Sequence, residues 1–142
     1  MTALRLDVLV PGTAVGDVLR LTAPLSFWGG VDPATGTITD VRHPEHGRSV
    51  AGRILAVPET RGSSSSSSIM LELIHAGRAP AALVLGSVDA ILVLGVLVAR
   101  EMGLPHPPVY ALPAAALAGL PGRLAIDAQG LVTDLEPGGA EP

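Results

Sequence analysis

Six consecutive serines, at positions 63–68, give this chain its clearest capacity for chemistry. They follow Arg61-Gly62 and lead into an apolar, helix-spaced run that begins at Ile69. A strand-like run at residues 53–57 precedes them, so the serines lie in a loop that feeds a helix N-terminus. Such a place offers unpaired backbone N–H groups and the positive end of the helix dipole. Serine hydroxyls there can cap the helix, bind an anion or act on a substrate.

Composition alone favours the simplest of these roles, a helix cap with flexible padding. A serine can also serve as an alkoxide base, but its free hydroxyl is far too weak without help. Arg61 and the helix dipole supply part of the necessary positive potential. The remainder would have to come from a partner.

A second polar cluster occupies residues 42–49 and contains His43, Glu45 and His46. These side chains suggest a metal site, but the intervening Pro44 and the lack of a second ligand cluster argue against one. We therefore predict no metal on this chain. A solvated loop and a contact to substrate or to another subunit through His43 and His46 remain as alternatives. The chain also has no cysteine, so it cannot supply thiolate ligands to zinc or to an iron–sulfur cluster.

The composition limits the class of protein. The 142 residues suffice for one domain, and 48% of them are hydrophobic. With one Phe, one Trp and one Tyr, the core must consist of aliphatic residues, which suits parallel or barrel-like strands covered by helices. The net charge of −4 and the absence of a basic patch argue against nucleic-acid binding.

The chain is predicted to be cytoplasmic. Its first residues alternate in polarity and do not form the apolar block of a signal peptide. Residues 81–99 are apolar over about the length of a bilayer span. However, Asp89 lies near their middle, and its charge would be costly in lipid. We expect a buried strand, a turn capped by Asp89 and a buried helix, and no membrane contact.

The order of the elements predicts the fold. Hydrophobic periodicity places strands at residues 4–10, 14–21, 37–41, 50–57, 81–85 and 109–112, and a hairpin at residues 124–134. Helices are predicted at residues 69–76, 89–102 and 113–120. This pattern indicates an α/β fold with a strand-rich, barrel-like core and helices at one side. We expect a single domain over residues 1–135 and a flexible tail at residues 136–142.

Three linked blocks of residues carry a family resemblance. They are Asp32-Pro33-x-Thr35-Gly36-x-Ile38-x-Asp40, then His43-Pro44-x-x-Gly47-x-Ser49-x-x-Gly52-x-Ile54-Leu55, then Gly62-Ser63-Ser64-Ser65 with Glu72 and Ala79-Pro80-Ala81. Together they resemble the small subunit of aconitase X-type dehydratases, from about Leu4 to Leu135. The resemblance implies the swivelling β/β/α domain of the aconitase superfamily.

The same resemblance implies roles for the serine loop. The family's proton-abstracting serine corresponds to Ser63, with Gly62, Ser64 and Ser65 holding an anionic group of the substrate or the alkoxide. Ordinary aconitases have an arginine where this chain has Ser65, which argues against citrate or isocitrate as substrate. From the residues themselves we infer that Arg61 neutralises a substrate carboxylate, with a structural ion pair as the alternative.

The resemblance further implies a partner and a reaction. A separate large subunit would carry an iron or iron–sulfur centre, which acts as a Lewis acid on the leaving hydroxyl of a small hydroxy acid. The family's substrates are cis-3-hydroxy-L-proline in bacteria and phosphomevalonate in archaea. The lysine-free, Ala/Gly/Arg-rich composition and the unbroken serine run favour hydroxyproline dehydration. Phosphomevalonate dehydration is the alternative, and so is a non-catalytic assembly subunit that only binds an anion.

Overall fold

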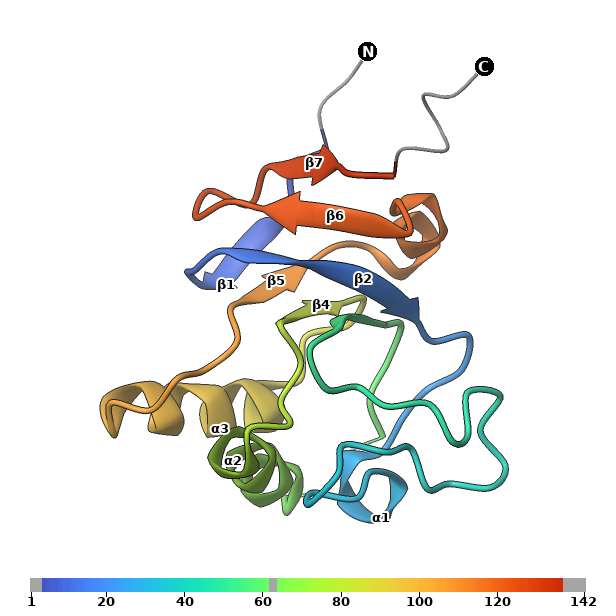
Figure 1. Cartoon of the computed structure of the whole chain (residues 1–142), viewed down its shortest axis with the longest axis vertical. Coiled ribbons are helices and arrows are strands. Elements are labelled where there is room, and N and C mark those ends of the chain that lie inside the picture. Colours follow the sequence, from blue (N-terminus) through green and yellow to red (C-terminus); the bar gives the residue numbers. More distant parts are fainter. Residues whose placement is uncertain (1–3, 62–63, 137–142) are drawn as a thin grey trace.

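One curled sheet organises the computed structural model, which describes residues 4–61 and 64–136 (Figure 1). Its strand order is β1-β5-β4-β3-β2-β6-β7. The central strands β2 to β5 run parallel, whereas β1, β6 and β7 pair antiparallel with their neighbours. The strands are β1 (Asp7–Val10), β2 (Ala14–Arg20), β3 (Ile54–Val57), β4 (Ala82–Leu85), β5 (Val109–Ala111), β6 (Arg123–Ile126) and β7 (Val132–Asp134).

The two edges of this sheet meet, which gives the predicted barrel-like core. An isolated antiparallel bridge joins Arg5, just before β1, to Leu131, just before β7. The Leu6 amide donates to the Gly130 carbonyl at 2.8 Å, and the Val132 amide donates to the Leu4 carbonyl at 2.9 Å. Both edge strands therefore have partners where an open sheet would expose unpaired backbone groups.

Two helices form the parallel crossovers and lie side by side against the sheet (Figure 1). Helix α2 (Ser66–Ala76) connects β3 to β4, and helix α3 (Ala90–Glu101) connects β4 to β5. The predicted end of this helix at residue 76 is confirmed for α2, where Gly77 has a left-handed φ of 71° and caps the helix through its amide. Two short elements complete the helices of the described residues, namely α1 (Phe27–Gly30) and the 3₁₀ helix η1 (Ala114–Gly119).

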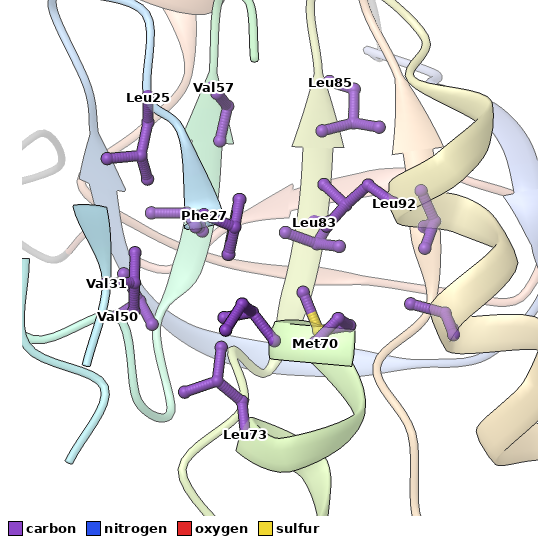
Figure 2. Packing of buried hydrophobic residues seen from close by; sticks show 14 of the residues in the cluster. Leu25, Phe27, Val31, Val50, Val57, Met70, Leu73, Leu83, Leu85 and Leu92 are labelled. Atoms are coloured by element: carbon purple, nitrogen blue, oxygen red, sulfur yellow. The ribbon is translucent and has the colours of Figure 1, made fainter. Parts of the chain in front are cut away.

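The sheet separates two hydrophobic clusters. Successive residues of β3 and β4 point to opposite faces, so Leu55 and Leu83 pack against the helices, while Ile54 and Val84 fill the inside of the curled sheet. Figure 2 shows the helix-side cluster, where Leu83 and Leu85 of β4 lie near Met70 of α2 and Leu92 of α3. Burial on both faces explains why β3 and β4 contain no polar residue.

Two sequence predictions for strands need correction. Residues 37–41 do not form a strand and make only isolated bridges, Val31 with Ile38 and Thr37 with Ser49. The turn before them, closed by the Gly36 amide on the Asp32 carbonyl at 2.7 Å, brings Ile38 back against Val31, and the pairing extends no further than single bridges. In β1 the register shifts between Val8 and Val10, so the alternation changes face and Val10 joins the helix-side cluster.

The segment that resembled a membrane span folds as strand β4, a turn and helix α3, as predicted. Among the described residues, no helix has the length and hydropathy that crossing a bilayer requires. The tail prediction concerns mainly residues 137–142, which lie outside the described residues. At the first residue of the predicted tail, the Glu136 carboxylate accepts a hydrogen bond from the Gly122 amide at 2.7 Å.

Helices α2 and α3 touch at a position where only glycine fits. A methyl group added at Gly95 of α3 would lie 2.7 Å from the Ser67 carbonyl oxygen and 3.0 Å from its Cα, both backbone atoms of α2. The absent side chain thus fixes how closely the first turn of α2 approaches α3.

We predict that Gly95→Ala destabilises the chain. Overpacking against backbone costs roughly 1–3 kcal/mol, which exceeds or cancels the roughly 1 kcal/mol that alanine gains over glycine in a helix. Thermal unfolding should show a lower melting temperature. Gly119→Ala is the control, because its methyl would meet nothing within 4 Å. Equal or higher stability of Gly95→Ala relative to this control would contradict the close approach.

The single tyrosine, Tyr110, is buried inside the curled sheet. Its hydroxyl donates to the Gly12 carbonyl at 2.6 Å. Burial, with a smaller contribution from the Asp127 carboxylate, raises the pKa of Tyr110 from 10.0 to about 12. The folded chain therefore favours the neutral phenol more strongly than the unfolded chain does.

This shift predicts a loss of stability in alkali. The contribution is fully present below pH 10 and disappears as the pH rises towards about 12, where the buried phenol ionises. The sequence has no lysine or cysteine, so no other side chain titrates in that window. Denaturant unfolding at increasing pH, with tyrosinate absorbance recorded in parallel, should show the decline. In Tyr110→Phe the curve should be flat over the same window, and an equal decline there would refute the assignment.

Candidate active site

The serine loop lies at the edge where two neighbouring parallel strands end. Strands β3 and β4 finish at Val57 and Leu85, and helices α2 and α3 begin beyond them. Ligand sites in open α/β sheets form at this carboxyl edge of the strands. Ser63 and Gly62, the predicted base and its neighbour, lie outside the described residues. Their predicted roles stay predictions, and the structure describes the residues on either side of them.

The segment before the serines is fixed by backbone pairing with Leu25. The Leu25 amide donates to the Glu59 carbonyl at 3.1 Å, and the Arg61 amide donates to the Leu25 carbonyl at 2.9 Å. A parallel bridge between Leu25 and Thr60 accompanies these bonds. Leu25 itself is buried. The chain thus stays extended and paired beyond β3, up to Arg61.

Asp89 joins this segment to the start of α3. One carboxylate oxygen accepts hydrogen bonds from the Ile91 amide at 3.0 Å and the Leu92 amide at 3.2 Å, which confirms the predicted cap. The other oxygen accepts a bond from the Thr60 hydroxyl at 2.6 Å. The link from Thr60 to Asp89 was not predicted. The signal was present, because both residues closely follow adjacent parallel strands.

Gly86 lets the turn after β4 approach the segment that follows β3. Its amide donates to the Val57 carbonyl at 2.8 Å. An added methyl group would lie 2.6 Å from the Pro58 carbonyl oxygen and 3.0 Å from the Ala114 Cβ. Any larger residue would displace the segment that leads to the serines.

The segment after Ser63 begins α2. Ser65 is the N-cap residue, and residues 66–68 form the first turn, so α2 begins before the predicted start at Ile69. The Ser67 hydroxyl donates to the Ser64 carbonyl at 3.3 Å, which holds the loop against the helix. The first turn contains no acidic residue, so no carboxylate compensates the positive end of the helix dipole. Ser64 is exposed at this end.

Arg61 is exposed and makes no side-chain hydrogen bond or ion pair with any residue in the described ranges. The alternative of a structural ion pair thus finds no partner among them. The guanidinium lies one residue before Gly62 and is available to an anionic group. Whether it binds substrate stays a prediction.

Ser66 differs from its neighbours because its side chain is enclosed. The residue is 1% exposed, and its hydroxyl oxygen has no hydrogen-bond partner in the part of the chain that the structure describes. A buried hydroxyl without a partner costs about 1–3 kcal/mol. Ser66 therefore weakens the fold at the base of the serine loop.

Ser66→Ala should accordingly stabilise the chain. Removing the unpartnered hydroxyl is expected to raise the free energy of unfolding by about 1 kcal/mol, or the melting temperature by roughly 3 °C for a chain of this size. Ser68→Ala is the matched control, since Ser68 is exposed in the same helical turn and shares only the gain in helix propensity. A lower melting temperature for Ser66→Ala than for the control would show that its hydroxyl has a partner.

His43 is buried, contrary to the solvated-loop alternative. It is 5% exposed, its Nε2 lies 3.2 Å from the Ala23 carbonyl, and its Nδ1 accepts a bond from the Glu45 amide at 3.0 Å. The Glu45 carboxylate in turn accepts from the Thr22 amide at 3.0 Å. These bonds fasten residues 43–45 onto residues 22–23. His46 is exposed, and a contact of His43 or His46 to substrate or subunit stays a prediction.

The described residues provide no donor set that fits an iron centre. No three His, Asp or Glu side chains gather at metal-binding distance within residues 4–61 and 64–136. The sequence also lacks the cysteines that hold iron–sulfur clusters. The prediction that this chain binds no metal stays a prediction.

Known proteins that resemble this chain identify its family. The family model described as "Aconitase X swivel domain" matches residues 3–126. The chain belongs to the aconitase X swivel-domain family. The crystal structure of aconitase X from Thermococcus kodakaraensis, in its holo-form, superposes with a TM-score of 0.82 and 32% sequence identity, over 96% of this chain and 100% of that chain. The predicted swivel fold, with a barrel-like sheet core flanked by helices, is confirmed.

Two curated relatives of this swivel domain represent different enzymes. Cis-3-hydroxy-L-proline dehydratase of Pseudomonas aeruginosa is 52% identical over 94 residues, which cover 66% of this chain but 16% of that protein. The small subunit of phosphomevalonate dehydratase from Methanothermobacter thermautotrophicus is 40% identical over 92 residues, covering 65% of this chain and 70% of that subunit. The match therefore spans a small part of the first relative and most of the second.

Proposed function

We propose that this chain is the small subunit of a two-subunit hydro-lyase and that it supplies the serine base for dehydration. The observation that carries the proposal is the position of the serine run, at the carboxyl edge of β3 within a swivel domain whose relatives are dehydratases. An exposed arginine precedes the run, and a helix N-terminus without acidic residues follows it.

Ser63 is proposed as the base that takes a proton from the carbon next to the hydroxyl-bearing carbon. The electron pair of the broken C–H bond becomes the new double bond, and the hydroxyl departs, so that one water is lost overall. Gly62, Ser64 and Ser65 would hold the anionic group of the substrate or the alkoxide through N–H groups at the start of α2. Arg61 would face a substrate carboxylate.

The active site is proposed to be shared between two chains. The archaeal relative is named a small subunit, and the described residues of this chain contain no group of side chains that could hold a metal ion. We therefore assign the iron or iron–sulfur centre to a large subunit. A serine base needs more positive potential than Arg61 and the α2 dipole provide, which also favours a completing partner.

Cis-3-hydroxy-L-proline is the proposed substrate. The chain is 52% identical to the P. aeruginosa hydroxyproline dehydratase, compared with 40% for the M. thermautotrophicus phosphomevalonate dehydratase subunit. Phosphomevalonate is the alternative substrate. The alternative function is that of a non-catalytic subunit whose serine loop only binds an anion.

The decisive experiment is Ser63→Ala in a complex with the large subunit from the same source. Turnover of cis-3-hydroxy-L-proline should fall by about 10²–10⁴-fold, the usual contribution of a general base, while the complex still assembles. Ser68→Ala, in the first turn of α2, should keep wild-type turnover. Both variants are also assayed with phosphomevalonate as the substrate.

Near-normal turnover by Ser63→Ala would refute Ser63 as the base. If the complex turns over phosphomevalonate but not cis-3-hydroxy-L-proline, the proposed substrate is wrong and the proposed mechanism stands. An isolated chain that dehydrates either compound would refute the two-subunit proposal. A complex inactive on both compounds but binding one of them would favour the non-catalytic alternative.

A further inference from the structure

The solvent side of α3 is apolar. Its buried side is formed by Leu92, Gly95, Val96 and Ala99. Six large apolar residues in this helix or next to it are between 37% and 65% exposed. This α3 outer face comprises Ile91, Leu94, Leu97 and Val98 of α3, with Val88 just before the helix and Met102 at its end. No charged residue interrupts the helix between Asp89 and Arg100. A helix that is apolar all round is normally buried on every side.

This concentration of exposed apolar side chains is unusual within the chain. The α3 outer face holds six of the eleven large apolar residues that are at least about a third exposed in the described ranges. Four of them, Ile91, Leu94, Val98 and Met102, follow helical spacing and form one stripe. Contiguous apolar patches of this kind mark interaction surfaces in monomers.

The α3 outer face starts at the candidate active site. Val88 and Ile91 flank Asp89, whose carboxylate binds the Thr60 hydroxyl at 2.6 Å. The serine loop follows Thr60 directly. A partner that completes the active site at this edge would therefore also contact the first turn of α3. From that turn the apolar stripe continues along the helix.

We propose that the α3 outer face docks onto the large subunit of the dehydratase, a partner with a complementary apolar surface. This inference rests on the proposed function. In the P. aeruginosa relative the matched part is 16% of one longer protein, so the swivel domain there shares a chain with a much larger remainder. A standard interface buries about 800 Å² per partner. The α3 outer face would form the apolar centre of such an interface, surrounded by a polar rim.

The test uses the full chain and its large subunit. Leu94→Glu combined with Val98→Glu places two charges in the centre of the stripe and should weaken binding to the large subunit at least about tenfold. Val15→Glu is the matched control, because Val15 is 57% exposed, like Leu94 at 52%, but lies near the start of β2. Binding is measured by biolayer interferometry, and thermal unfolding verifies that each variant is folded.

A second variant keeps the test independent of the charge substitutions. Because the chain has no cysteine, Leu94→Cys introduces a unique thiol. Its rate of alkylation should fall at least about tenfold when the large subunit is added, whereas a thiol at Val15→Cys should react at an unchanged rate. Unchanged labelling at both positions would overturn the docking proposal.

The outcomes separate this proposal from the proposed function. Wild-type binding by the Leu94→Glu, Val98→Glu variant overturns docking through α3 only. If that variant abolishes self-association but still binds the large subunit, the occupant is a second copy, and the proposal fails. If docking requires α3 but Ser63→Ala retains turnover, the base assignment fails while the interface stands. Absence of binding by the unmodified chain overturns the interface and the two-subunit proposal together.

Discussion

The Asp89 carboxylate is the interaction on which the candidate site depends. It satisfies two amides at the start of α3 and, through its other oxygen, holds the Thr60 hydroxyl. Hydrogen bonds to an ionised acceptor are stronger than neutral ones. The carboxylate also partly compensates the positive end of the α3 dipole. The corresponding end of α2 has no acidic residue in its first turn, so the positive potential of this edge is concentrated at the serine loop.

Close approach of backbones gives this arrangement its rigidity. Gly86 brings the β4–α3 turn against Pro58, and Gly95 brings α3 against the first turn of α2. Leu25 pairs with residues 59–61 on the other side. The residues on either side of positions 62–63 are therefore held by three separate elements. A site built from backbone contacts tolerates few larger side chains, and a distortion in one loop is passed directly to the next.

Elements with strong local signals could be predicted from the sequence. The apolar runs of β3 and β4, the Asp89 cap and the end of α2 at residue 76 all depend on neighbouring residues, and all are confirmed. Features that depend on distant partners were missed. The burial of His43 results from its contact with Ala23, twenty residues away, and the Thr60–Asp89 bond spans a whole strand and helix. Residues 37–41 have strand-like alternation, but no adjacent strand is present to extend their bridges.

The joined edges of the sheet have an evolutionary consequence. Leu4 and Val132 are hydrogen-bonded to each other, and β7 lies at the opposite end of the molecule from α2 and α3 (Figure 1). A polypeptide tethered at this edge would leave the serine loop unobstructed. The domain can therefore be joined to another polypeptide at this edge, or exist apart from it, without any change at the serine loop. This arrangement is compatible with matches both to part of a much longer dehydratase and to a small subunit.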